Sequence, residues 1–218
     1  MRIRTFATSS SKQWLQRHTS DYYVKQSINN NVRSRSYYKL EEILIKHQQQ
    51  LISLKGTWID LGCSPGGWSL SAVNFMKKHN FSSNLIGVDL LPMEAIPGAH
   101  FIQGNFLDET VKDEVKNRIV TNNKDVTMVL SDMLQNTSGD HARDHFKSIE
   151  LSRAALSFAY DMLPFNTGGF ICKYLRGEDE KEFIDEAKDI FKEVKVVKPK
   201  ASRPESAEAY ILCLKKKS

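Results

Sequence analysis

The fold of this chain is decided by the stretch Thr57-Trp58-Ile59-Asp60-Leu61-Gly62-Cys63-Ser64-Pro65-Gly66-Gly67-Trp68. Its first five residues form a short apolar run that ends at a glycine, which is typical of a buried strand. Gly62, Gly66 and Gly67 then allow the backbone to turn sharply and approach a ligand, because glycine has no Cβ. Residues 69–79 follow with apolar side chains at helical spacing. The stretch therefore predicts a strand, a ligand-binding loop and a helix.

The same alternation of strands and helices continues to the end of the chain. The patterns predict strands at 57–61, 85–89, 100–102, 125–131, 169–174, 194–197 and 209–214, and helices at 69–79, 107–121, 146–163 and 181–191. Strands that alternate with helices predict a mostly parallel sheet with helices on both faces. The last two strands have little helix between them, so we expect an antiparallel hairpin at one edge. The predicted fold class is α/β, with a Rossmann-like, mostly parallel seven-stranded sheet.

The composition is that of a globular chain with a basic balance. The chain has 218 residues, 40% of them hydrophobic, a net charge of +5 and a pI of about 9.0. This balance suits a polyanionic partner, although many basic proteins bind no nucleic acid. Cys63, Cys172 and Cys213 are far apart, which argues against disulfides and zinc, and Cys172 and Cys213 are expected in the core. We expect no metal site, and no apolar run approaches the roughly 20 residues of a membrane span.

Three segments are predicted along the chain. Residues 1–20 contain Arg2, Arg4 and Arg17 and no acidic residue, which fits a mitochondrial presequence or a short basic arm that contacts RNA. Residues 21–56 are predicted to form a helical, RNA-facing extension. Residues 57–218 are predicted to form the ligand-binding domain, and we expect a monomer.

Polar residues at strand ends predict a nucleoside-type cofactor. Asp89 ends the second predicted strand, where a carboxylate can accept hydrogen bonds from two ribose hydroxyls. Asn105 and Phe106 follow the third strand and could hold an adenine, and Asp132 follows the fourth. The glycine spacing G-x-x-x-G-G differs from G-x-G-x-x-G, which weakens a dinucleotide interpretation. A plain tight turn is the alternative for the loop alone.

Four charged residues are candidates for catalysis: Lys39, Asp132, Lys173 and Glu208. Charged residues at strand ends are usually only solvated, so none of the four is informative alone. Lys173 follows an apolar strand at the carboxyl edge of the sheet. A lysine acts as a general base only if burial or a neighbouring cation lowers its pKa, and Lys39 could be that cation.

Motifs along nearly the whole chain resemble the FtsJ/RrmJ family of ribosomal RNA 2′-O-methyltransferases. The matching motifs are Ser9–Gln16, Asp21–Val24, Arg33–Arg35, Tyr38–Leu40, Asp60–Gly62, Pro65–Ser69, Asp89–Met93, Gln103–Gly104 with Phe106, Ser131–Met133 and Glu208–Tyr210. The resemblance implies a class I fold that binds S-adenosylmethionine and needs no metal. It departs from the family at Asn105, where an aspartate is usual, and at Gln135, where a proline is usual.

The resemblance also implies a role for each site residue. Lys173 would accept the proton of the 2′-hydroxyl. Lys39 and Glu208 would orient Lys173 and tune its pKa, and Asp132 would position both the cofactor and Lys173. The implied cofactor contacts are Gly62, Ser64, Pro65, Gly66, Gly67, Trp68, Asp89, Asn105, Phe106 and Asp132. The implied RNA contacts are Arg33, Arg35 and Tyr38, although an amphipathic helix with core tyrosines would explain the same stretch.

The resulting hypothesis is methylation of a ribose, expected to be a uridine, in large-subunit ribosomal RNA or the large subunit itself. The acid-free N-terminus favours a mitochondrial location, with a cytoplasmic or bacterial-like enzyme as the alternative. Two further hypotheses stay open: a tRNA 2′-O-methyltransferase, and a catalytically silent RNA-binding factor for ribosome assembly. A nicotinamide-dependent reductase is disfavoured by the missing G-x-G-x-x-G.

Overall fold

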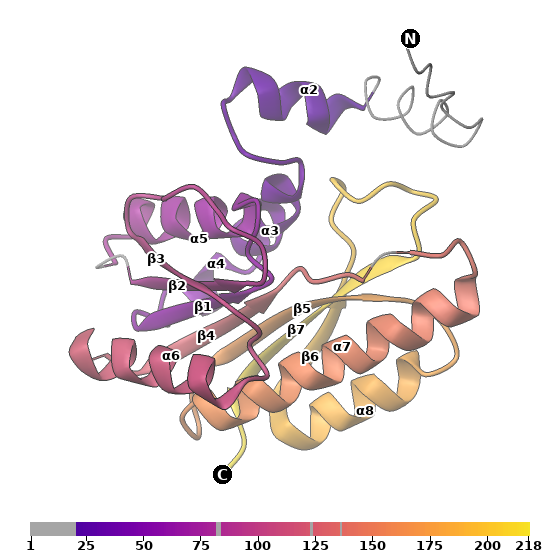
Figure 1. The fold of residues 1–218 in the computed structure, drawn as a ribbon. Helices are drawn as coiled ribbons and strands as arrows, with labels where there is room; N and C mark the ends of the chain where they lie inside the picture. The colour runs from indigo at the N-terminus through magenta and orange to yellow at the C-terminus, as the bar shows by residue number, and fades with distance from the viewer. Residues whose placement is uncertain (1–20, 82–83, 123, 136) are drawn as a thin grey trace, which may run out of the picture.

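The computed structural model describes residues 21–81, 84–122, 124–135 and 137–218, which form one seven-stranded sheet between two layers of helices (Figure 1). The strands are β1 (Thr57–Leu61), β2 (Leu85–Asp89), β3 (Ala99–Gln103), β4 (Val126–Ser131), β5 (Gly169–Leu175), β6 (Phe191–Val197) and β7 (Glu208–Lys216). The helices are α2 (Tyr22–Asn29), α3 (Ser36–Lys46), α4 (Gln48–Leu51), α5 (Gly67–Lys78), α6 (Glu109–Asn122), α7 (His141–Met162) and α8 (Glu180–Ile190).

The strand order is β3-β2-β1-β4-β5-β7-β6. The first five strands of this order pair in parallel, and β7 runs antiparallel between β5 and β6. The predicted α/β sheet and its antiparallel edge hairpin are therefore confirmed. The order reverses between β1 and β4, and a crevice for ligands forms at such a switch point, outside the carboxyl ends of the strands.

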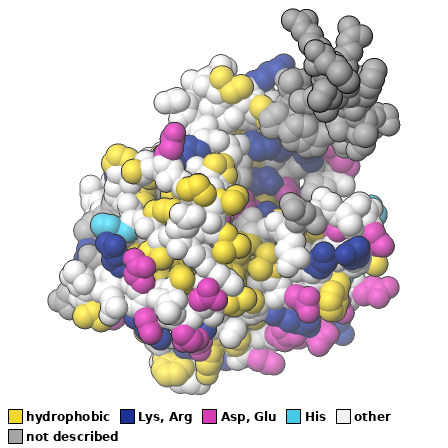
Figure 2. All heavy atoms as spheres, viewed as in Figure 1, with side chains coloured by type: hydrophobic (Ala, Val, Ile, Leu, Met, Phe, Trp, Pro, Cys, Tyr) yellow, Lys and Arg dark blue, Asp and Glu magenta, His cyan; other side chains and the backbone are white. Residues whose placement is uncertain are grey.

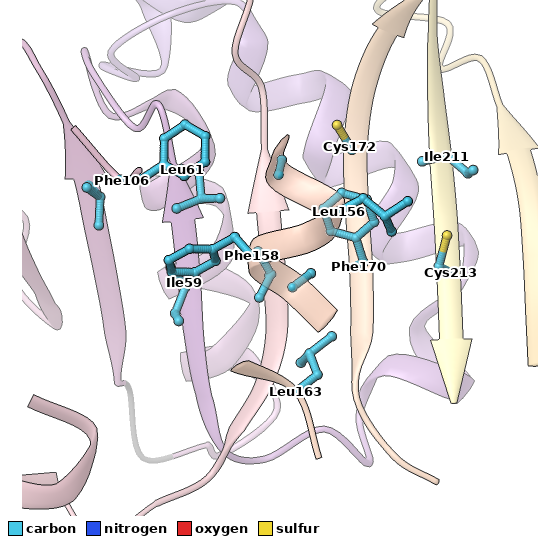
Figure 3. Close-up of a cluster of buried hydrophobic side chains, with 14 of the residues drawn as sticks. Ile59, Leu61, Phe106, Leu156, Phe158, Leu163, Phe170, Cys172, Ile211 and Cys213 are labelled. Atoms are coloured by element: carbon cyan, nitrogen blue, oxygen red, sulfur yellow. The ribbon is translucent and has the colours of Figure 1, made fainter. Parts of the chain in front are cut away.

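Each face of the sheet has its own hydrophobic core. Helices α6, α7 and α8 cover one face, and α3, α4 and α5 cover the other (Figure 1). On the first face, strand residues such as Ile59 and Phe170 meet Leu156 and Phe158 of α7 (Figure 3). Because both faces are covered, the central strands β1, β4 and β5 are buried along nearly their whole length, whereas the edge strands β3 and β6 are partly exposed.

The second core corrects the predicted domain boundary at residue 57. Leu40, Ile43 and Leu44 of α3 are at most 1% exposed and belong to the same cluster as Trp58 of β1 and Trp68 of α5. Residues from α3 onward are thus part of the domain and not an extension of it, because they supply one of its two cores. The prediction for residues 1–20 lies outside the described residues.

Two predicted elements differ from the structure in ways that affect the site. Helix α7 begins at His141, five residues before the predicted start, where Asp140 accepts hydrogen bonds from the backbone N–H groups of Ala142 and Arg143. Strand β7 is also longer than the predicted 209–214 and begins at Glu208, while Lys173 lies within β5, inside the strand predicted at 169–174. Their side chains are therefore held by the sheet and not by loops.

The three cysteines are free and buried. Burial raises the pKa of the Cys172 thiol to about 11, so it stays protonated at neutral pH. The core positions predicted for Cys172 and Cys213 are confirmed. Within the described residues, no helix is long and apolar enough to cross a membrane, and no group of three or more His, Cys, Asp or Glu side chains could hold a metal ion.

Candidate active site

The loop between β1 and α5 is shaped by two glycines with left-handed backbone. Gly62 has φ +71° and Gly66 has φ +106°, and a Cβ on Gly62 would lie 2.2 Å from Cγ of Met133. Between them lie Ser64 and Pro65, joined by a cis peptide bond. The loop therefore brings its backbone close to the segment that follows β4, which no residue with a side chain could do without displacing Met133.

Asp89 closes the loop from the neighbouring strand. One oxygen of its carboxylate accepts a hydrogen bond from the backbone N–H of Ser64 (2.9 Å), and the other accepts one from the N–H of Leu91 (2.8 Å). Each carboxylate oxygen can accept a further hydrogen bond, so these contacts orient the carboxylate and leave it able to bind a ligand. The structure thus brings Asp89 against the glycine loop at the carboxyl edge of the sheet, as the sequence predicts.

Three predicted cofactor contacts have structural roles. Gly67 lets α3 approach α5, because a Cβ on it would lie 2.2 Å from Oγ of Ser34. Trp68 is 2% exposed and packs against Tyr210, with ring centroids 5.8 Å apart. Phe106 is 7% exposed and packs edge-on against Phe158 in the core. Both rings are thus packed inside the protein, and the predicted contacts of Trp68 and Phe106 with a cofactor stay predictions.

Asn105 lies just after β3, as the sequence predicts. Its Oδ1 accepts a hydrogen bond from the backbone N–H of Leu107 at 3.1 Å, and its side chain is only partly buried. The amide nitrogen has no partner within the described residues. Asn105 can therefore donate to a ring nitrogen of a base, whereas an aspartate at this position could only accept.

Lys173 and Asp132 form the first ion pair of the site. Nζ of Lys173 donates a hydrogen bond to the backbone oxygen of Asp132 (2.6 Å) and lies 2.9 Å from its Oδ1. Their side chains are 8% and 16% exposed. Oδ1 is buried and accepts no well-aligned hydrogen bond from a described residue. Because Lys173 lies in β5 and Asp132 follows β4, the pair is built from neighbouring strands.

Lys39 and Glu208 form the second ion pair. Nζ of Lys39 on α3 donates to Oε2 of Glu208 on β7 at 2.7 Å, and the two side chains are 11% and 12% exposed. Burial by itself would raise the pKa of Glu208, but the charge and hydrogen bond of Lys39 outweigh it and hold that pKa below its ordinary value. Lys173 contributes to the same lowering, so the charges of the two pairs interact.

The residues predicted to contact RNA make hydrogen bonds within their own chain. Arg33 donates three hydrogen bonds to the backbone oxygens of Pro65, Glu94 and Ala95. Tyr38 is 4% exposed, and its hydroxyl accepts a hydrogen bond from Asn30 at 2.9 Å. The predicted stacking of Tyr38 on a base is corrected, because its ring is buried. Arg33 braces the glycine loop through Pro65.

Arg35 is likewise bound by its own chain. It forms an ion pair with Asp21 and donates to the backbone oxygen of Ala201 at 2.5 Å. It also lines the cleft beside Lys39, so its guanidinium is part of that wall although its bonds are internal.

Comparison with known proteins fits this geometry. The sequence profile of the FtsJ-like methyltransferase family matches residues 32–216. The chain belongs to this family. The FtsJ-like chain is 40% identical over 204 residues to the ribosomal RNA large subunit methyltransferase E of Francisella philomiragia, covering 94% of this chain and 95% of the relative. It is 41% identical over 205 residues to the protein of the same name from Francisella tularensis, with the same coverage.

A solved structure supports the same fold. A protein from Plasmodium falciparum, described as a ribosomal RNA methyltransferase, superposes with a TM-score of 0.71 at 27% identity. The superposition covers 84% of this chain and 98% of the other. The class I methyltransferase fold and the methyltransferase character of this FtsJ-like enzyme are thereby confirmed.

The site of the FtsJ-like enzyme fits a nucleoside cofactor. The glycine loop offers close backbone approach, Asp89 offers carboxylate acceptors at the end of β2, and Asn105 offers an amide after β3. Asp132 adds a carboxylate after β4, which is 16% exposed and is held by Nζ of Lys173. Gly62, Ser64, Asp89, Asn105 and Asp132 would hold such a cofactor.

Sequence patterns missed two buried polar groups beside the site. Asp60 is fully buried on β1, and its Oδ2 accepts a hydrogen bond from Oγ of Ser69 at 2.6 Å. Burial raises the pKa of Asp60 to about 7, and the charges of Asp132 and Asp89 add to this rise. Tyr210 is fully buried, and burial raises the pKa of its hydroxyl. Both lie within apolar runs, which hide polar residues from pattern analysis.

Proposed function

We propose that this chain transfers a methyl group from S-adenosylmethionine to the 2′-hydroxyl of a ribose, a uridine, in large-subunit ribosomal RNA. The observation that carries the proposal is the convergence of two ion pairs, Lys173 with Asp132 and Lys39 with Glu208, at the sheet edge that holds the glycine loop. A hydroxyl attacks a methyl group only if its proton is removed, and a lysine amine held in a fixed place can remove it.

S-adenosylmethionine as the donor is supported by the fit of the loop and by membership of the family. When bound, it supplies an electrophilic methyl group on a positively charged sulfur. The new C–O bond would form as the C–S bond breaks, and Nζ of Lys173 would take the proton of the 2′-hydroxyl after the ammonium has released one of its own protons to solvent.

The four charged residues have distinct tasks in this scheme. Asp132 holds Nζ of Lys173 through its backbone oxygen and carboxylate, so the amine stays in one place. Glu208, whose pKa is lowered, stays ionised and keeps the charge of Lys39 fixed beside the acceptor ribose. Holding the reacting groups in line supplies a large share of the acceleration.

Ribosomal RNA as the substrate is supported by the two Francisella relatives, both named ribosomal RNA large subunit methyltransferase E. Mapping of ribose methylation in a strain that lacks the gene should reveal one missing 2′-O-methyl uridine in large-subunit RNA. Labelling in vitro should favour large subunits or their RNA over purified tRNA. If no site is lost, the proposal is wrong, and preferential labelling of tRNA would assign the enzyme to tRNA.

We further propose, on the basis of the basic, acid-free residues 1–20, that the protein acts in mitochondria, and we expect it to be a monomer. A C-terminal fluorescent fusion should co-localise with a mitochondrial marker, and light scattering should give the mass of one chain, 24.9 kDa. A diffuse cytoplasmic signal would contradict the location and leave residues 1–20 as an RNA-contacting arm.

A further inference from the structure

We infer that the RNA strand beside the target ribose lies in a cleft next to the Lys39–Glu208 pair, and that Arg176 and Arg203 hold its phosphodiester backbone. The inference rests on the proposed function and adds the place and the contacts of the acceptor strand. Neither arginine belongs to the stretch around Arg33 and Arg35 in which the sequence predicts RNA binding.

The cleft has a volume of about 590 Å³, which is within the range of ligand pockets. Lys39 and Glu208 line it together with three other segments. One segment is the start of the β5–α8 loop at Arg176, another is the β6–β7 loop from Arg203 to Ala207, and the third is the turn before α7. A strand that entered this cleft would therefore run beside one of the two catalytic ion pairs.

Arg176 is weakly held on one side of the cleft. Its backbone N–H donates to the oxygen of Ala207 at 2.9 Å, which joins the β5–α8 and β6–β7 loops. Its side chain is 49% exposed, and its carboxylate partner, Glu180, is 3.8 Å away. Glu180 also accepts a 2.7 Å hydrogen bond from the hydroxyl of Tyr174. An exposed pair of this kind contributes little, so the guanidinium can exchange Glu180 for a phosphate.

Arg203 is fixed on the β6–β7 loop by one nitrogen only. Its Nε lies 3.1 Å from Oδ2 of Asp21, the oxygen that also pairs with Arg35. One carboxylate thus serves two guanidinium groups, which leaves a net positive charge on this wall. The terminal nitrogens of Arg203 contact no acceptor in the part of the chain that the structure describes. Such a fork can bind two phosphate oxygens at once.

Three carboxylates also line the cleft. Glu208 is paired with Lys39, and Asp144 accepts hydrogen bonds from the backbone of Ser138 and Gly139. Glu205 is exposed. In Figure 2, Lys and Arg side chains gather between α2 and the loop that follows β6. Among the cations of the cleft, Arg176 and Arg203 have the weakest bonds to the rest of the chain, because Arg176 has one exposed pair at 3.8 Å and Arg203 is paired through Nε alone.

The test compares Arg176→Gln and Arg203→Gln with a matched control, Arg118→Gln. Arg118 resembles Arg176: its side chain is 46% exposed and it forms an i,i+4 pair with Glu114 at 3.7 Å, but it lies on α6, away from the cleft. The measurements are the KM for unmethylated large-subunit RNA and the affinity for a fluorescein-labelled single-stranded RNA at several salt concentrations.

Each cleft variant should raise KM about tenfold with kcat within about threefold, and reduce the salt slope by about 0.7 for the lost phosphate contact. Arg118→Gln should match the wild type. Glu180→Gln, which releases Arg176 and keeps an acceptor for Tyr174, should bind RNA more tightly, an effect that a merely structural arginine would not produce.

Two outcomes separate this inference from the proposed function. If the wild type methylates large-subunit RNA while Arg176→Gln keeps its KM and salt slope, the cleft assignment is wrong and the function stands. If the wild type transfers no methyl group to ribosomal RNA, the proposed function fails first. Arg203→Lys, which keeps a cation near Asp21, replaces Arg203→Gln if the latter does not fold.

Discussion

The ammonium group of Lys173 has two oxygen neighbours, both on Asp132, and almost no contact with solvent. Replacing Lys173 with Met keeps the length of the side chain and removes the amine. We expect methyl transfer to fall by about 100-fold or more, because the 2′-hydroxyl loses its proton acceptor. Binding of S-adenosylmethionine, measured by calorimetry, should change less than about threefold.

The control for this variant is Lys188→Met, because Lys188 forms only an exposed pair with Asp185 on α8. It should retain full activity. Persistent methyl transfer by Lys173→Met would show that another group accepts the proton.

Asp60 is expected to make the stability of the folded protein depend on pH. Its pKa of about 7 lies above the ordinary value of 3.8, so the folded protein binds more protons than the unfolded chain between these values. The free energy of unfolding should therefore decrease as pH rises from about 4 through 7. Asp60→Asn resembles the protonated carboxyl, and it should flatten this slope in urea titrations at pH 5, 6, 7 and 8. An unchanged slope would mean that Asp60 does not titrate in this range.

At the scale of elements, a buried lysine of β7 caps the C-terminal end of helix α7. Nζ of Lys216 on β7 donates hydrogen bonds to the backbone oxygens of Tyr160 and Leu163, and it lies 4.2 Å from the ring centroid of Tyr160. Lys216→Met would remove the donor from both carbonyls, of which that of Leu163 is buried and that of Tyr160 partly buried. We expect a loss of about 2–4 kcal/mol of unfolding free energy, because each unsatisfied group costs about 1–3 kcal/mol.

Urea unfolding at pH 7 measures this loss, and methyl transfer per folded molecule should stay unchanged. The neighbouring Lys215→Met is the control, because the Lys215 side chain is 59% exposed and pairs only with Glu193. Equal stability of the two variants would contradict a capping role for Lys216.

Most elements could be predicted because their apolar spacing reports which face is buried. The exception is the first turn of α7, from His141 to His145, which is polar and carries no apolar spacing. Its start is indicated only by Asp140, a side chain that caps the backbone locally. The start of β7 was also predicted one residue too late, because its first residue is Glu208, a charged residue that the site uses.

At the scale of the whole molecule, two carboxylates join the N-terminal helices to the β6–β7 loop. Asp21 pairs with Arg35 and Arg203, and Glu42 accepts hydrogen bonds from the backbone N–H groups of Lys200 and Ala201. Asp21→Asn combined with Glu42→Gln should speed amide hydrogen exchange in residues 198–207 by about tenfold or more. Exchange in β1 and β4 should not change, because these strands lie in the cores. Equal protection of the loop would show that other contacts hold it.

The site could be predicted only in part from the sequence. Charged residues at strand ends were informative, and the structure brings Lys39 to Glu208 and Lys173 to Asp132. The sequence alone does not show which charged residues form ion pairs with each other, because the partners are far apart along the chain. It also cannot separate an arginine that binds RNA from one that braces a loop, as Arg33 does.

Strand β7 also has a consequence for biosynthesis. It lies between β5 and β6 in the sheet, although both of these strands are synthesised before it. It also carries Glu208, whose partner Lys39 lies 169 residues earlier in the sequence. Synthesis proceeds from the N-terminus at about 5–20 residues per second, so the facing edges of β5 and β6 stay unpaired until this strand arrives. Unpaired edges invite association with other chains. Until β7 is added, we expect the nascent chain to be inactive and prone to aggregation. The pairing of β7 with β5 and β6 completes the active site and covers both strand edges.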